Sequence, residues 1–375
     1  MKDFRFYCPV ELIFGDGALN RLPKYISPAK RVMVVTGTTW ARKSGLLDRV
    51  IGLLKKALVE HISAASAEPN PSIATVEKAA ERARRQRIEL VIGLGGGSAM
   101  DAAKAIAVCA TNSRPLRELF PIHDFPEKPL PIICIPTTAG TGSEMAPYAI
   151  ITDEKVNDKF NLNSPATFPK ISLLDPQLTV SMPPSITADT GIDALCHAIE
   201  GYLAKRSQPI SDFIALEAIR TVKESLPKVF ISPDNLEARG RMLYAAALAG
   251  IVIAHTGTVA LHAFGYHLTL KYGQSHGRAN ATLLPHFLKS IEQTVPEKIN
   301  KIYAIFEDGG QKRGVEAIFD FVHQLGVSTK LCDYGLTPED IPTYRDYVVP
   351  RGNTRNTPGD YGADQIEKLL LNALE

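Results

Sequence analysis

The stretch that decides the fold runs from Glu89 to Ala110 and reads ELVIGLGGGSAMDAAKAIAVCA. Residues 89–95 are mostly apolar and end in glycine, which is typical of a buried strand. Residues 98–110 carry small and apolar side chains at helical spacing, so we expect a helix there. A strand, a glycine turn and a helix in this order predict a parallel sheet that is covered by helices.

The flanking sequence repeats this alternation of strands and helices. We expect strands at RVMVVTG (31–37) and LPIICIPTT (130–138), and a helical segment that follows the first of them to about Leu58. A further helix, IATVEKAAERARRQR (73–87), follows the Pro69-Asn70-Pro71 turn. The first part of the chain is therefore predicted to be an α/β Rossmann-like domain.

The second half has a different texture. Alanine- and leucine-rich segments at helical spacing predict an all-α helical bundle: DALCHAIEGYLA, DFIALEAIRTVKESL and RMLYAAALAGIVIA. Paired prolines in TVSMPPSITAD (179–189) can continue neither a strand nor a helix. We therefore predict domains at 1–181 and 182–375.

Bulk composition is that of a globular protein. The 375 residues are 45% hydrophobic and carry a formal net charge of +2, which does not favour nucleic acid or an anionic membrane as a partner. The five cysteines are far apart and form no CxxC pair, so reduced thiols and a cytoplasmic location are expected. We find neither a signal-peptide pattern nor an uncharged apolar run of about 18 residues.

Two loops at expected strand ends could hold a nucleotide. Gly95, Gly96, Gly97 and Ser98 lie where backbone amides and a helix N-terminus can bind a pyrophosphate. The spacing is not GxGxxG, so a purely structural turn remains the alternative. The second loop, PTTAGTGSE (136–144), offers hydroxyl side chains that could line a ligand or only cap the turn: Thr137, Thr138, Thr141 and Ser143.

A set of one carboxylate and three imidazoles could hold a metal ion. Asp193 and His197 are four residues apart and share one helix face, although such a pair alone is often only a surface hydrogen bond. His262 and His276 bracket the segment HAFGYHLTLKYGQSH and complete four candidate ligands. Nitrogen and oxygen ligands of this kind suit Fe²⁺ or Zn²⁺, whereas Mg²⁺ and Ca²⁺ favour oxygen throughout.

His267 is a separate candidate. It follows His262 by five residues and could line the pocket or relay a proton during catalysis. The alternative is an ordinary packed or solvated histidine.

Taken together, the motifs resemble the iron-containing (group III) alcohol dehydrogenase family. The likeness covers nearly the whole chain, in this order: FYCPVELIFGDGAL, PNP, GLGGGSAMDAAK, PTTAGTGSE, TADTGIDALCHAIE, LHAFGYH and SHGRANATLLPH. The resemblance implies a Rossmann-like domain followed by an all-helical metal domain, an architecture like that of dehydroquinate synthase, with the active site in the cleft between them.

The family motifs assign roles to individual positions. The implied metal ligands are Asp193, His197, His262 and His276. The implied cofactor contacts are Gly95, Gly96, Gly97 and Ser98 for the pyrophosphate, Asn70 and Lys159 near the ribose, Thr137, Thr138, Thr141 and Ser143 near the adenine or nicotinamide, and Asp101 in GGGSxxDxxK. Asp101 could alternatively form a surface ion pair with Lys104.

One position departs from the family pattern. Many members that resemble NAD-preferring enzymes carry an aspartate at the end of the first strand, where this chain has Gly37. Without that negative charge a 2′-phosphate is not repelled, and Thr38, Thr39, Arg42 or Lys43 could contact it. We therefore expect NADP(H) to be accepted in addition to NAD(H).

The predicted activity is that of a metal-dependent alcohol dehydrogenase or aldehyde reductase. Hydride would move between NAD(P)(H) and a small alcohol or aldehyde while a divalent metal, Fe²⁺ or Zn²⁺, acts as a Lewis acid on the substrate oxygen. The alternatives are a glycerol-type polyol dehydrogenase, a dehydroquinate synthase and a nucleotide-binding protein without activity. The resemblance also implies a homodimer.

Overall fold

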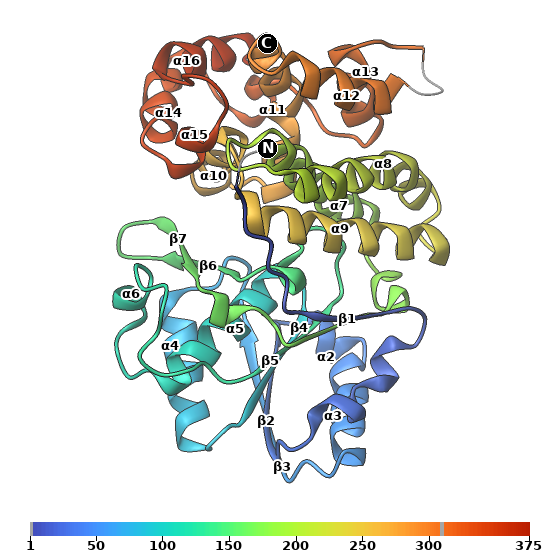
Figure 1. Cartoon of the computed structure of the whole chain (residues 1–375), viewed down its shortest axis with the longest axis vertical. Coiled ribbons are helices and arrows are strands. Elements are labelled where there is room, and N and C mark those ends of the chain that lie inside the picture. The colour runs from blue at the N-terminus through green and yellow to red at the C-terminus, as the bar shows by residue number, and fades with distance from the viewer. Residues whose placement is uncertain (1–2, 308–310) are drawn as a thin grey trace. The chain divides into compact units, whose positions relative to one another are not determined.

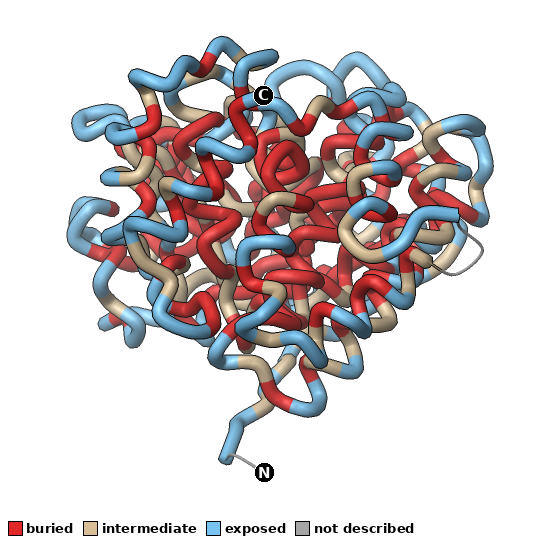
Figure 2. Tube along the Cα trace, turned by 90° about the horizontal axis from the view of Figure 1, so that it is seen from above, coloured by how far each residue is buried: buried red, intermediate tan, exposed pale blue. Residues whose placement is uncertain are grey.

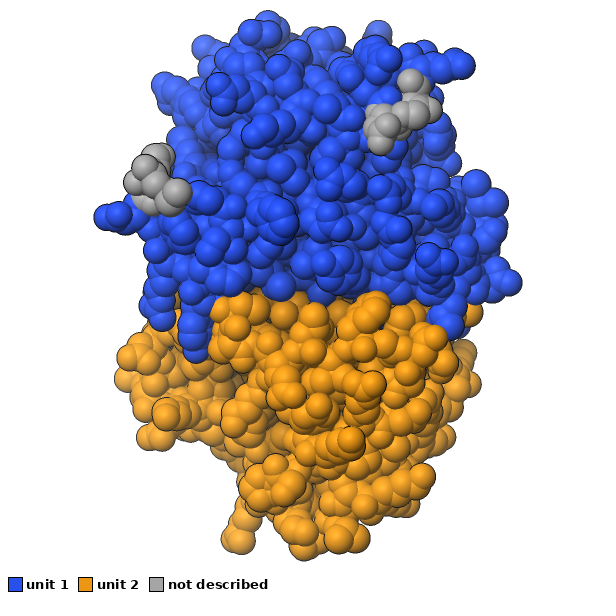
Figure 3. Space-filling model, turned by 45° about the vertical axis from the view of Figure 1, so that its right-hand side comes forward, with its two compact units in different colours: residues 1–7, 139–141, 181–375 blue, residues 8–138, 142–180 orange. Residues whose placement is uncertain are grey.

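The computed structural model describes residues 3–307 and 311–375, which belong to two compact units. Figure 3 draws them in different colours. Unit 2 comprises residues 8–138 and 142–180, and unit 1 comprises residues 1–7, 139–141 and 181–375.

Unit 2 is an α/β structure. Its strands are β1 (Glu11–Phe14), β2 (Arg31–Gly37), β3 (His61–Ala67), β4 (Leu90–Gly95), β5 (Ile132–Pro136), β6 (Tyr148–Asp153), β7 (Asp158–Asn163) and β8 (Ile171–Leu174). Its α-helices are α1 (Pro23–Ile26), α2 (Trp40–Lys43), α3 (Leu46–Lys56), α4 (Ile73–Arg85), α5 (Gly97–Thr111) and α6 (Leu116–Leu119). Short 3₁₀ turns are η1 (Ala18–Arg21), η2 (Ser143–Met145), η3 (Pro165–Thr167) and η4 (Pro176–Thr179).

The main sheet is parallel and has the order β1-β8-β5-β4-β2-β3. From β2 the chain first moves outward to β3 and then crosses to β4 on the other side of β2. The strand order therefore reverses between β2 and β4. Ligands bind outside the carboxyl ends of the strands at such a switch point.

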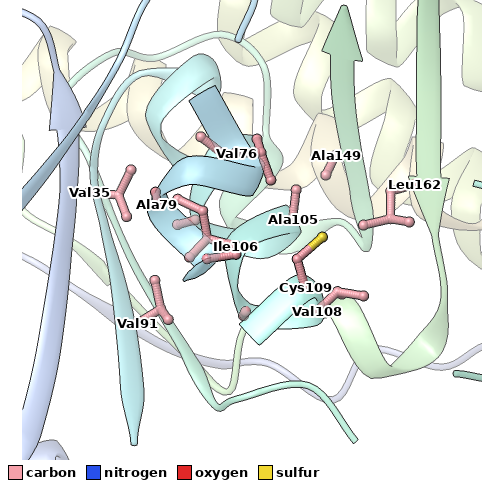
Figure 4. Close-up of a cluster of buried hydrophobic side chains, with 14 of the residues drawn as sticks. Val35, Val76, Ala79, Val91, Ala105, Ile106, Val108, Cys109, Ala149 and Leu162 are labelled. Carbon is pink, nitrogen blue, oxygen red and sulfur yellow. The ribbon is translucent and has the colours of Figure 1, made fainter. Parts of the chain in front are cut away.

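Helices cover both faces of this sheet because successive strand residues point in opposite directions. Val32 and Val34 of β2 pack in the hydrophobic cluster that includes α3, whereas Met33 and Val35 pack in the cluster that includes α4 and α5. Figure 4 labels part of this second cluster, including Val35 and Val91 from the sheet, Val76 and Ala79 from α4, and Ile106 from α5.

The predicted central strands and helices of unit 2 are confirmed, but several other strands of this unit were not predicted. The strands expected at 31–37, 89–95 and 130–138 are β2, β4 and β5, and the expected helices are α4 and α5. The edge strand β1, the strands β3 and β8, and the antiparallel hairpin β6-β7 were not predicted. These strands are short, and their identity depends on pairing with distant residues.

Unit 1 contains helices and turns, as the bundle prediction required. Its α-helices are α7 (Pro184–Leu203), α8 (Pro209–Ile231), α9 (Leu236–Thr256), α10 (Ala260–Tyr272), α11 (His276–Ile291), α12 (Pro296–Glu307), α13 (Val315–Gln324), α14 (Ile341–Val348), α15 (Gly352–Asn356) and α16 (Ala363–Asn372) (Figure 1). Its 3₁₀ turns are η5 (Leu331–Tyr334) and η6 (Pro338–Asp340). The expected fold class, α/β followed by all-α, is confirmed.

The centre of the helical unit is α7, which is buried along most of its length. Helices α8, α9 and α11 pack against it. Figure 2 shows how buried segments alternate with exposed turns along the chain. A helix buried on all sides can carry polar groups only if they are paired or bind a ligand.

Two further features bear on the sequence expectations. In the described ranges 3–307 and 311–375, no single helix has the length and apolar composition needed to cross a membrane, and one bent pair, α9 with α10, meets that criterion together. All five cysteines are free thiols.

Candidate active site

The glycine loop joins β4 to α5 and is built by close packing. Gly95 ends β4 with a φ of 151°, a region that strongly favours glycine. A Cβ on Gly93 would lie 2.9 Å from the Cα of Met100, and one on Gly95 would lie 2.9 Å from the Cβ of Ala99. These glycines therefore let the start of α5 lie directly against β4. The first-turn amides of α5 have no preceding helical carbonyl to bind, which suits them to phosphate oxygens.

The predicted nucleotide positions meet at the switch point of the sheet. Gly37 and Gly95 end the neighbouring strands β2 and β4, and a Cβ on Gly95 would lie 3.7 Å from the Gly37 amide nitrogen. Asn70 donates its amide N–H to Ser98 Oγ at 3.2 Å, and Lys159 Nζ donates to Asn70 Oδ1 at 2.9 Å. The structure thus brings together these five residues, which are widely separated in the sequence.

Asp101 and Ser143 form a buried polar network within unit 2. Ser143 Oγ donates to Asp101 Oδ1 at 2.6 Å, and the Ile150 amide donates to Asp101 Oδ2 at 3.0 Å. Lys104 Nζ is fully buried and donates to Ser143 Oγ at 2.7 Å and to the Tyr148 carbonyl at 2.7 Å. Lys104 is therefore not at a helix surface, and the network ties α5 to the segment that leads into β6.

The threonines of the second loop occupy different places. Thr137 is buried directly after β5 and donates its amide to the Gly95 carbonyl at 3.0 Å. Thr138 lies against the glycine loop, since a Cβ on Gly96 would be 3.2 Å from its Oγ1. Thr141 falls in the short segment 139–141 that belongs to unit 1. Contact of any of these side chains with a cofactor stays a prediction.

The four proposed metal ligands come from three helices of unit 1. Asp193 and His197 lie in α7, His262 in α10, and His276 is the first residue of α11. His262 Nε2 lies 2.9 Å from His197 Nε2, and His276 Nε2 lies 3.8 Å from Asp193 Oδ1. His197 Nδ1 also lies 3.9 Å from Asp193 Oδ2. Potential ligand atoms of Asp193, His262 and His276 all lie within 4.8 Å of one another.

Two glycines allow these helices to approach so closely. A Cβ on Gly277 would lie 1.8 Å from the backbone oxygen of Asp189 in α7, and one on Gly265 would lie 1.8 Å from Asn280 Oδ1 in α11. Both distances are far inside van der Waals contact. Only glycine therefore permits the close approach of the α11 backbone to α7 at Gly277. The same holds at Gly265, where α10 meets the Asn280 side chain of α11.

Burial and neighbouring groups set the protonation of the ligands. Burial alone would raise the pKa of Asp193, but the nearby imidazoles, His197 first, outweigh it and lower that pKa. Burial lowers the pKa of His197 to about 4, although Asp193 opposes the shift. At neutral pH the site therefore offers an ionised carboxylate beside a neutral imidazole, the forms in which both bind metals.

Glu200 fixes which nitrogen of His262 carries its proton. The Glu200 carboxylate is fully buried, and its Oε1 contacts His262 Nδ1. Its Oε2 accepts the backbone amides of Val259 at 2.8 Å and His262 at 3.2 Å. Because a carboxylate accepts here, Nδ1 holds the hydrogen and the Nε2 lone pair faces His197.

The donor set fits a divalent transition metal. An ion with bonds of about 2.0–2.2 Å to tetrahedral N and O ligands keeps those atoms about 3.4 Å apart. The separations of 2.9 Å and 3.8 Å lie on either side of that spacing. Asn280 supports the carboxylate by donating Nδ2 to Asp193 Oδ1 at 3.3 Å. A second set of side chains that orients the ligands is a common feature of metal sites.

Replacing Glu200 by glutamine tests this support. Glu200→Gln keeps the volume but removes the charge that holds the His262 tautomer, and loss of such a partner weakens metal affinity by about 10–100-fold. We expect this loss in competition titrations of the apoenzyme with Zn²⁺ and a chromophoric chelator. Glu217→Gln, at a half-buried glutamate of α8 paired with Arg220, is the control. Equal affinity in Glu200→Gln and the wild type would contradict the assignment.

His267 lies in α10, five residues after His262. Its ring stacks on Tyr344 with centroids 4.2 Å apart and also contacts Tyr347. Burial, followed by the charge of Lys271, lowers its pKa to about 4. The ring is therefore neutral and packed among tyrosines, and its role as a proton relay stays a prediction.

Sequence reasoning did not assign three residues that support the proposed metal ligands. Glu200 follows His197 by less than one turn on the same apolar helix, and this spacing was a detectable signal. Asn280 and Tyr266 gave no such signal, because their contacts with the ligands depend on how α10 and α11 cross. Tyr266 stacks on His276 with ring centroids 5.3 Å apart.

Comparisons with known proteins agree with this geometry. The model for iron-containing alcohol dehydrogenase matches residues 9–176, and the C-terminal model of the Fe-containing alcohol dehydrogenase family matches residues 187–374. Alcohol dehydrogenase 4 of Schizosaccharomyces pombe is 32% identical over 98% of this chain and 89% of its own length. The NADPH-dependent butanol dehydrogenase of Clostridium saccharobutylicum is 31% identical over 98% of this chain and 97% of its own.

A solved structure extends the likeness to three dimensions. The iron-containing alcohol dehydrogenase of Thermotoga maritima has a TM-score of 0.89 and 36% identity, over 99% of each chain. The family expected from the motifs is therefore confirmed across both the nucleotide loops and the helices with the proposed ligands. The chain belongs to the iron-containing alcohol dehydrogenase family.

Proposed function

We propose that Asp193, His197, His262 and His276 hold the catalytic divalent metal of an NAD(P)-dependent alcohol dehydrogenase that interconverts a small alcohol and its aldehyde. The observation that carries the proposal is the buried pair of imidazole Nε2 atoms, 2.9 Å apart, beside the Asp193 carboxylate. Two imidazoles in such contact beside a carboxylate suit a shared ion. Aldehyde reduction measured before and after metal removal tests the proposal.

The bound divalent metal supplies Lewis acidity toward the substrate oxygen. Asp193 contributes a negative charge to the ligand set, and Glu200 keeps His262 in the tautomer that presents Nε2. A nicotinamide cofactor, when bound, would supply the hydride acceptor for alcohol oxidation, and the proton of the substrate hydroxyl would leave to solvent. No nucleophilic side chain is required. His267 remains our candidate for the group that passes this proton.

The nucleotide loops would hold the cofactor. The proposal places the pyrophosphate at Gly95, Gly96, Gly97 and Ser98, at the N-terminus of α5, because that turn lies at the switch point of the sheet. Asn70 and Lys159 are joined by a hydrogen bond of 2.9 Å beside Ser98 and would contact the ribose. Asp101 and Ser143 would act through the buried network that positions the loop.

Gly37 would let the enzyme use NADP(H). A Cβ on Gly37 would meet no atom within 4 Å, so there is space at this strand end for either a carboxylate or the 2′-phosphate of a cofactor. Arg42 and Lys43 follow in the last turn of α2 and are exposed. Their positive charges favour a phosphate over bare hydroxyls.

Introducing an aspartate tests the cofactor proposal. Gly37→Asp is expected to lower kcat/KM for NADPH by about 10–100-fold, because like charges brought together cost several kcal/mol before screening by solvent. NADH should be affected far less. Steady-state kinetics with both cofactors measure the ratio. Gly52→Asp places the same charge elsewhere on unit 2 and should leave it unchanged. Strong preference of the wild type for NADH would count against the proposal.

The remaining proposals concern the alternative activities, the resident ion, the oligomeric state and the cellular location. A glycerol-type polyol dehydrogenase or a dehydroquinate synthase is not favoured, since relatives of this chain are named alcohol, 1,3-propanediol and butanol dehydrogenases. We further propose Fe²⁺ as the resident ion, with Zn²⁺ as the alternative that the same ligands accept. A homodimer and a cytoplasmic location stay predictions.

A further inference from the structure

Tyr266 is the aromatic residue of α10 that faces the proposed ligands. It follows His262 by four residues and therefore lies one turn further along the same helix face. Its ring is stacked on His276, with centroids 5.3 Å apart and planes inclined by 17°. The same ring meets His262 edge-on, with centroids 6.1 Å apart and planes at 90°. One tyrosine thus contacts two ligands from different helices.

His276 is the ligand that most needs such support. Its side chain is 27% exposed, compared with 3% for His262 and 7% for His197. It is also the first residue of α11, where the backbone is held by fewer helical hydrogen bonds than in the helix interior. By contrast, His262 is held by the buried carboxylate of Glu200.

The packing around the ring also limits how His276 can turn. Its imidazole lies edge-on to that of His262, with centroids 4.9 Å apart and planes at 74°. Tyr266 covers a face of the same imidazole in a nearly parallel stack. Rotation of the imidazole about its bond to Cβ would break the stack and swing Nε2 away from Asp193 Oδ1, which lies 3.8 Å from it.

We propose that Tyr266 is a positioning residue whose ring holds the His276 imidazole in its ligand orientation and so determines how tightly the metal is retained. The inference rests on the proposed metal site and adds to it a residue that is not a ligand. The contacts with the two histidines are made by the aromatic ring, so we assign the role to the ring.

The predicted effect follows from the stacking interaction. An aromatic pair contributes about 0.5–1.5 kcal/mol beyond its buried area, which corresponds to about 2–10-fold in a binding constant. Tyr266→Leu keeps apolar bulk but removes the ring, and is expected to weaken Zn²⁺ and Co²⁺ binding by about that factor. Tyr266→Phe keeps the ring and is expected to bind both ions as the wild type does.

The experiment uses full-length apoenzyme titrated with Zn²⁺ or Co²⁺ against a chromophoric chelator. The visible absorption of bound Co²⁺ reports ligand geometry directly, and we expect it to change in Tyr266→Leu and to be restored in Tyr266→Phe. Tyr272→Leu is the matched control, since Tyr272 lies in the same helix and contacts His267 instead of the ligands. Thermal unfolding of the metal-free variants checks that each is folded.

The outcomes separate this inference from the site itself. Wild-type affinity and an unchanged Co²⁺ spectrum in Tyr266→Leu would overturn the inference while leaving the metal site intact. An equal loss in Tyr266→Phe and Tyr266→Leu would also overturn it, because the hydroxyl would then be responsible. Failure of the wild type to bind one equivalent of metal would overturn both the proposed site and the inference.

Discussion

Replacing His262 by alanine is expected to lower kcat/KM for aldehyde reduction by about 10³-fold or more. The change removes a proposed ligand whose Nε2 lies 2.9 Å from His197 Nε2, and it leaves the Glu200 carboxylate buried without its imidazole partner. Lewis-acid stabilisation of the substrate oxygen is worth several kcal/mol, and about 4 kcal/mol corresponds to the stated loss. Removing the metal from the wild type with a chelator should have the same effect.

The measurement follows NAD(P)H absorbance during aldehyde reduction, with metal content determined on the same samples. Activity of the chelated wild type should return when Fe²⁺ or Zn²⁺ is added, whereas activity of His262→Ala should not. The control is His323→Ala, which should retain activity. His323 is exposed and forms a hydrogen bond with Thr329. Full activity of the metal-free wild type would refute the mechanism.

Adding a single methyl group at Gly277 is expected to damage both stability and metal binding. A Cβ there would lie 1.8 Å from the Asp189 backbone oxygen and 3.2 Å from the Asp193 Cβ. Helix α11 must then move away from α7, and His276, the neighbouring residue, moves with it. Overpacking of this kind costs about 1–3 kcal/mol, so the melting temperature of Gly277→Ala should fall by about 2–12 °C.

Thermal unfolding of the metal-free protein measures the packing cost, and a chelator competition measures the loss of metal affinity. Gly52→Ala is the control, because Gly52 lies inside α3 and a Cβ there meets no atom within 4 Å. That variant should be unchanged or slightly more stable. If Gly277→Ala melted and bound metal like the wild type, close approach of α7 and α11 could not be what places His276.

Much of the fold was predictable because its signals are local. The apolar run that ends at Gly95 and the helix after it follow from residue type and spacing. The hairpin β6-β7 could not be recognised in this way, because its strands are defined by pairing with each other and by the partly buried Asp101 carboxylate that accepts the Ile150 amide. Such pairing depends on residues far apart in the sequence.

Only part of the candidate site could be predicted from local sequence. Asp193 and His197 could be paired from the sequence, since four residues of one helix make about one turn. Their partnership with His262 and His276 followed from ligand chemistry and family resemblance, because spacing alone does not say which helices meet. Lys104 shows what local sequence could not decide. A helix-surface ion pair with Asp101 was the alternative to a role in the family motif, and the structure buries Lys104 completely.

The sequence by itself determined the order of the proposed nucleotide loop and metal ligands, the helical or extended character of the central segments, and the types of donor atom available. These properties depend on side-chain chemistry and on the repeat of side-chain direction, which is two residues in a strand and 3.6 in a helix. Both can be read from a short stretch of sequence without knowing the fold. Only the tertiary structure decided how α7, α10 and α11 approach at Gly265 and Gly277, and hence that Glu200, Asn280 and Tyr266 surround the ligands. These contacts join residues far apart in the sequence, such as Asn280 and Asp193, which are 87 positions apart, and they exist only where helix packing brings the backbones together.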